Sequence, residues 1–161
     1  MEFDNTLIPV LRHGVDVIKM ILWKAQKAKL TTRFADAPPE HIARLTAATL
    51  NALFGIVNDA EPHATFIREH DADIQQALSH VATDHVELRD ALTDALRVQF
   101  LCDAEEGIDS QHILTQADAL GLLVTERETP LPKTFMHLAR VLGVAHGILD
   151  PRPDPAPPAH N

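Results

Sequence analysis

The segment LIPVLRHGVDVIKMILWKAQKAKL, Leu7 to Leu30, repeats apolar residues every three or four positions. This period matches the turn of an α-helix, about 3.6 residues, so it predicts an amphipathic helix from about residue 4 to residue 30. The apolar stripe of that helix is broad and is expected to face the protein core. It consists of Leu7, Leu11, Gly14, Ile18, Ile21, Leu22 and Ala25.

The rest of the chain continues the helical pattern. Strand signals are nearly absent: there is no Tyr, aromatic residues make up 4%, and no alternating Val/Ile/Thr run lies between turn residues. The sequence predicts an all-α protein of about six helices in an elongated bundle. Two helices are predicted to be long, about 4–30 and 72–105, and the others end near residues 57, 69, 121 and 147. Residues 1–149 form the predicted helical domain, and residues 150–161 form a proline-rich C-terminal tail, DPRPDPAPPAHN.

The two long helices also bear on oligomeric state. At about 1.5 Å per residue they would span roughly 40 Å and 50 Å. A globule of this chain length has a radius of gyration of only about 15 Å. Helices of this length favour an elongated bundle that completes its core with a second copy, so the sequence predicts a homodimer.

The composition limits the class of protein. No apolar segment is long enough to span a bilayer, and the acidic start Met1-Glu-Phe-Asp is unlike a signal peptide. Cys102 is the one cysteine, so no intrachain disulfide is possible. We therefore expect a cytoplasmic protein without a transmembrane segment.

Charge is unevenly distributed along the chain. The formal net charge is −9, yet residues 17–35 hold five basic residues and no acidic one. Residues 1–45 contain 7 Lys/Arg and 5 Asp/Glu, and the remainder contains 7 and 18. An acidic body disfavours nucleic acid, whereas the basic segment is suited to an acidic protein partner.

Within the basic segment, Lys19, Met20, Trp23 and Lys27 form a candidate protein interface. Trp23 lies away from the centre of the apolar stripe, and Lys19 and Lys27 flank it at four residues on either side. A Trp beside a Met and lysines is typical of an interface hot spot. The alternative is that Trp23 packs under a neighbouring helix while the lysine stems cover its edges.

A second hypothesis is a helical bundle that binds a divalent transition metal. The segment SHVATDHVELRD, Ser79 to Asp90, places histidines and carboxylates within about three helical turns. His80 and Asp84 share one turn of the predicted helix, and His85 lies with its apolar residues. The candidate ligands are His63, His70, Asp71, His80, Asp84 and His85. Such pairs also arise by chance in a chain this rich in histidines and acids, and they then belong to a solvated surface.

The dipeptide His70-Asp71 resembles the metal-binding pair of the HD-type phosphohydrolases, which are all-α. The resemblance implies His41 as the first ligand and Asp103 or Asp109 as the last. It is confined to these few residues, and the surrounding residues 68–73 are polar. The other interpretation is a helix boundary at which Asp71 or Asp73 caps the next helix.

Other chemistries have little support in the sequence. Cys102 has acidic neighbours that disfavour its thiolate, and no Gly-x-Ser-x-Gly motif is present. The predicted helices at 111–121 and 132–143 lack the basic residues and the tight turn of a DNA-binding helix-turn-helix. The sequence therefore favours a non-enzymatic regulatory, adaptor or accessory protein without a cofactor. The metal-binding bundle, with HD-type hydrolysis as its reaction, is the alternative.

Overall fold

The computed structural model describes residues 5–56, 60–82 and 85–151 of the 161-residue chain. The described part is all-α, as predicted, with seven α-helices, one short 3-10 helix and no strand. The elements are η1 (Asn5–Leu7), α1 (Ile8–Arg33), α2 (Pro39–Leu53), α3 (His63–Glu69), α4 (Asp71–Ser79), α5 (Val86–Glu105), α6 (Gln111–Ala119) and α7 (Pro132–Ala145). The proline-rich tail from residue 152 onward lies outside the described residues.

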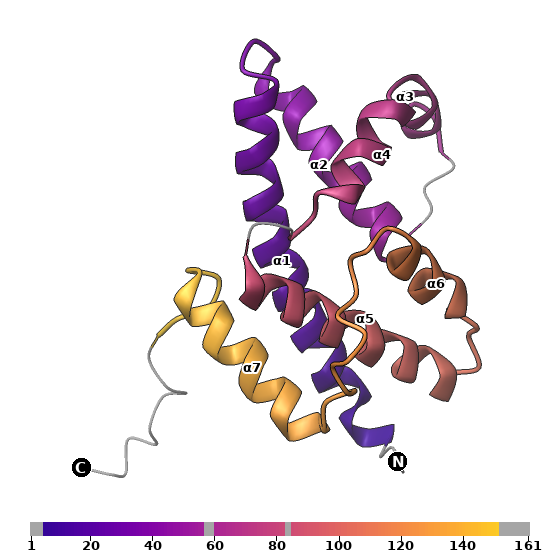
Figure 1. Ribbon diagram of the computed structural model, residues 1–161, viewed down its shortest axis with the longest axis vertical. Helices are drawn as coiled ribbons and strands as arrows, with labels where there is room; N and C mark the ends of the chain where they lie inside the picture. Colours follow the sequence, from indigo (N-terminus) through magenta and orange to yellow (C-terminus); the bar gives the residue numbers. More distant parts are fainter. Residues whose placement is uncertain (1–4, 57–59, 83–84, 152–161) are drawn as a thin grey trace.

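The helix α1 is the element around which the others pack. It runs the length of the molecule and is contacted by α2, α5 and α7 (Figure 1). The apolar stripe predicted from the sequence faces these neighbours, with Leu11, Ile18 and Ile21 almost fully buried. Gly14 allows α1 and α7 to approach closely, because a Cβ placed there would lie 2.9 Å from Cε2 of Phe135 on α7. The core therefore forms where α2, α5 and α7 pack against α1.

The prediction of one continuous helix over 72–105 was wrong. The chain leaves helical structure after Ser79, Ala82 adopts a left-handed φ of 59°, and α5 begins at Val86. Apolar residues of this segment are buried on two separate helices: α4 packs on α2, whereas α5 packs on α1. A straight helix of that length would extend beyond the core, so the break lets both halves bury their apolar faces.

The break is held by contacts from α1. The Lys29 ammonium donates a hydrogen bond of 2.8 Å to the carbonyl oxygen of His80, just after α4 ends. Val81 and Ala82 are buried at the turn itself. A cation beside the last carbonyls of a helix also interacts favourably with the helix dipole.

Charged side chains tie α5 to more distant elements. Asp94, which is only 1% exposed, accepts two hydrogen bonds from the Arg127 guanidinium, at 2.7 and 2.8 Å. Hydrogen bonding to Asp94 raises the pKa of Arg127. Asp94 is therefore an internal charge and not part of a solvated acidic surface. At the other end of α5, Arg12 of α1 pairs with Asp103 and Glu106.

The α3–α4 end of the molecule is built differently. It comprises two short helices: α4 packs against α2, and α3 packs against α4 and has no buried residue at all. Within the described residues, no helix is both long and apolar enough to cross a membrane.

Candidate functional sites

The four residues predicted as an interface lie on one exposed side of α1. Met20 is 52% exposed, Lys27 is exposed, and Lys19 and Trp23 are half-buried. The Lys27 ammonium lies 4.9 Å from the centre of the Trp23 ring, and the Lys19 ammonium lies 5.2 Å from that of Phe54. We call Lys19, Met20, Trp23 and Lys27 the α1 contact face.

Trp23 is partly buried, which is compatible with both of the alternatives that the sequence left open. Part of its ring packs against the hydrophobic core, and part remains open to solvent beside Lys27. A half-buried indole is held rigidly and still offers apolar surface, which is how aromatic anchors in interfaces are commonly presented.

The proposed metal ligands are spread over several elements. His63 is exposed at the start of α3, His80 is exposed after the end of α4, and His85 is exposed just before α5. The prediction that His85 points with the apolar set was wrong, because the helix on which it would lie does not continue through residue 85. Asp84 lies outside the described residues.

The histidines implied by the HD-type resemblance do come together. The rings of His41 and His70 have centroids 4.8 Å apart in an edge-on arrangement, and both contact Phe66, at 5.6 and 4.4 Å respectively. The Phe34 ring is also edge-on to His41, with 6.4 Å between the two ring centroids. This ring cluster joins the start of α2 to the boundary between α3 and α4.

The carboxylates implied by that resemblance are engaged elsewhere. Asp103 pairs with Arg12 at 3.0 Å, and Asp109 accepts a hydrogen bond from the backbone N–H of Gln111. Across residues 5–56, 60–82 and 85–151, no group of three or more His, Cys, Asp or Glu side chains is placed to hold a metal ion. Asp71 opens α4 and lies near the cavity described below.

Cys102 is not a nucleophile of any accessible site. Its side chain is fully buried, and burial raises the pKa of the thiol. The thiolate, which is the reactive form, is therefore disfavoured.

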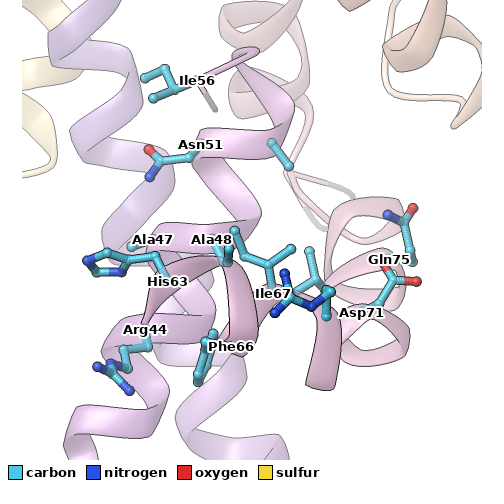
Figure 2. Close-up of a pocket in the computed structure, with 14 residues that line it drawn as sticks. Arg44, Ala47, Ala48, Asn51, Ile56, His63, Phe66, Ile67, Asp71 and Gln75 are labelled. Atoms are coloured by element: carbon cyan, nitrogen blue, oxygen red, sulfur yellow. The ribbon is translucent and has the colours of Figure 1, made fainter. Parts of the chain in front are cut away.

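A cavity between α2, α3 and α4 is the feature that sequence reasoning missed. Its volume is about 470 Å³. Much of its wall is apolar, with Ala48, Phe66 and Ile67 among the lining residues (Figure 2). In the close-up, Arg44 and His63 lie on one side of the cavity, and Asp71 and Gln75 lie on the other.

The sequence holds one signal for this cavity. Helix α2 carries Ala47, Ala48 and Ala52, and all three line the cavity. Small side chains leave space beneath a neighbouring helix that larger ones would fill. They also promote helix formation wherever they occur, so the alanines by themselves do not mark a cavity.

No protein-family model, curated protein or solved structure matches this chain. The interpretation of its sites therefore depends on their geometry and chemistry.

Proposed function

We propose that this protein is a non-enzymatic regulatory, adaptor or accessory protein of the cytoplasm that acts by self-association through the α1 contact face. The observation that carries the proposal is the half-exposed Met20 beside Trp23, with the Lys27 ammonium lying over the Trp23 ring. Apolar, polarisable side chains surrounded by charge are characteristic of surfaces that bind proteins.

The charge of the face indicates what it would bind. No acidic residue lies between residues 17 and 35, so Lys19 and Lys27 give the surface a positive potential. A partner with apolar side chains inside an acidic rim would complement it.

A second copy of the chain offers such a surface. Where α5 ends, Ile108 is 53% exposed, and Glu105 and Asp109 beside it are exposed as well. We call these three residues the acidic corner. If the α1 contact face of each copy met the acidic corner of the other, the two contacts would close a twofold dimer.

Light scattering or sedimentation of the purified protein tests the proposal at high micromolar concentration. We expect a dimer at low salt that dissociates as salt is added, because the exposed charges are then screened. A monomer under the low-salt conditions would contradict the proposal.

Point variants locate the contact. Trp23→Ala should weaken association by about 2 kcal/mol or more, as expected for a hot-spot residue, while leaving helicity largely intact. Lys27→Glu and Glu105→Lys should each weaken it as well. Lys133→Glu makes the same charge change at an exposed position of α7 and is the matched control. Equal dimerisation of Trp23→Ala and the wild type would place the interface elsewhere.

The metal-dependent hydrolase remains an alternative proposal because of one observation, the ring contact between His41 and His70. Elemental analysis of protein prepared without a histidine tag tests it. Stoichiometric iron, zinc or manganese, lost in a His70→Ala variant, would favour this function over self-association.

A further inference from the structure

The cavity between α2, α3 and α4 leaves apolar side chains open to solvent. Ile56 and Ile67, which both line it, are 46% and 37% exposed. Its volume of about 470 Å³ lies in the range of small-molecule sites, about 300–1,000 Å³, and such sites are typically apolar with a few polar groups. A ligand with an apolar body would remove this surface from water.

The charged groups that line the cavity are two arginines, Arg44 and Arg68, and one carboxylate, Asp71. His63 lines it as well. Arg68 already pairs with Glu61 at 3.3 Å. No carboxylate of the described residues forms an ion pair with Arg44, so its charge is available to a ligand.

The position of Arg44 is set by the wall of the cavity. Its guanidinium lies over the ring of Phe66, with 5.4 Å between the guanidinium carbon and the ring centroid. Stacking of this kind orients the planar guanidinium while leaving its N–H groups free to donate at the edge. The planar group matches a carboxylate, which accepts two parallel hydrogen bonds from it.

The two sides of the cavity differ in the groups they present. Arg44 and His63 lie on one side, Asp71 and Gln75 lie on the other, and Ile67 lies between them in the close-up (Figure 2). An anion is attracted to the first side and repelled by Asp71 on the second. A bound molecule would therefore take one orientation, with its charge toward Arg44.

We propose that this cavity binds a small amphiphilic monocarboxylate, whose carboxylate pairs with Arg44 and whose apolar body lies along Ala48, Phe66 and Ile67. The proposal goes beyond self-association, since no residue of the α1 contact face lines the cavity. The charge is that of a monoanion, because Arg44 is the one arginine of the lining without an ion pair among the described residues.

Titration calorimetry with decanoate, kept below its micellar concentration, tests the binding. We expect saturable binding of one decanoate per chain. Decanol, which has the same apolar body and no charge, should bind roughly tenfold more weakly or less, as expected for loss of a charged hydrogen bond. Absence of saturable decanoate binding, or equal affinity for decanol, would overturn the proposal.

Two variants assign the binding to the cavity. Arg44→Gln should weaken decanoate binding about tenfold while leaving decanol unaffected. Ala48→Phe should abolish binding of both, because the ring would fill the space along α2. Arg89→Gln, at an exposed arginine of α5 outside the cavity, is the matched control.

Circular dichroism establishes whether each variant is folded. If Ala48→Phe does not fold, the Arg44→Gln and Arg89→Gln pair still decides the question. Equal weakening by these two variants would indicate general electrostatic attraction and would overturn the assignment to Arg44. The oligomeric state, measured on the same samples, reports separately on the α1 contact face.

Discussion

The body formed by α1, α5 and α7 and the α3–α4 end of the molecule are stabilised in different ways. The body has fully buried residues on each of its helices and includes Asp94, a nearly inaccessible carboxylate neutralised by Arg127. The α3–α4 end has one helix without a buried residue, and its ion pair Arg68–Glu61 is exposed on both sides. The difference indicates that the body determines the stability of the protein, whereas the α3–α4 end leaves apolar side chains exposed to solvent.

The largest effect expected is on the buried charge of the body. Arg127→Ala would leave the Asp94 carboxylate buried without a partner, and this should lower the free energy of unfolding by about 3–5 kcal/mol. Urea unfolding followed by circular dichroism measures it. Arg89→Ala, at an exposed position of the same helix as Asp94, should change stability by about 0.5 kcal/mol or less. Similar losses of unfolding free energy in both variants would mean that the buried charge of the body is no more important for stability than an exposed one.

The next largest effect separates the two regions directly. Backbone amides of α3 should exchange with solvent about a hundredfold or more faster than those in the middle of α5, because helices with few buried contacts open locally without global unfolding. Hydrogen exchange measured by mass spectrometry tests this. Equal protection of the two helices would show that the α3–α4 end unfolds only together with the body.

The smallest effect concerns an exposed network at the start of α3. A hydrogen bond from the Thr65 hydroxyl lowers the pKa of Glu61 below its usual 4.5. Since the folded value is depressed, the contribution of this contact is present above pH 4.5 and is lost as pH falls through the lower value. In Thr65→Val, the Glu61 pKa should move back toward 4.5, as measured by NMR titration of its carboxyl carbon.

The control for that titration is Thr115→Val on α6, where the hydroxyl donates to the backbone oxygen of Gln111 instead of to a carboxylate. It should leave Glu61 unchanged. A Glu61 pKa that does not respond to Thr65→Val would mean that another contact depresses it, and the exposed network would then be more extensive than these residues.

The candidate sites differ in how far sequence could predict them. That the residues of the α1 contact face share one side of a helix could be predicted from spacing alone, because the residues on one face of a single helix follow from its period. The cavity was missed, since its walls come from three helices whose packing is not encoded in any one of them. The proximity of His41 and His70 was implied only by the resemblance of one dipeptide to the HD-type phosphohydrolases. Among the described residues, no third metal ligand accompanies these two histidines.

The sequence by itself determined the all-α class and the apolar stripe of α1, with the burial of residues such as Leu11 and Ile18, because these depend on local periodicity and on the removal of apolar surface from water. Only the tertiary structure decided where the helix predicted over 72–105 breaks and where Asp94 finds its partner. A break that places α4 against α2 and α5 against α1 is favourable only once those neighbouring helices are in position. The ion pair likewise depends on the fold, because Arg127 is 33 residues from Asp94 along the chain. Contacts between residues far apart in the chain do not recur at a fixed spacing, so the sequence pattern does not predict them.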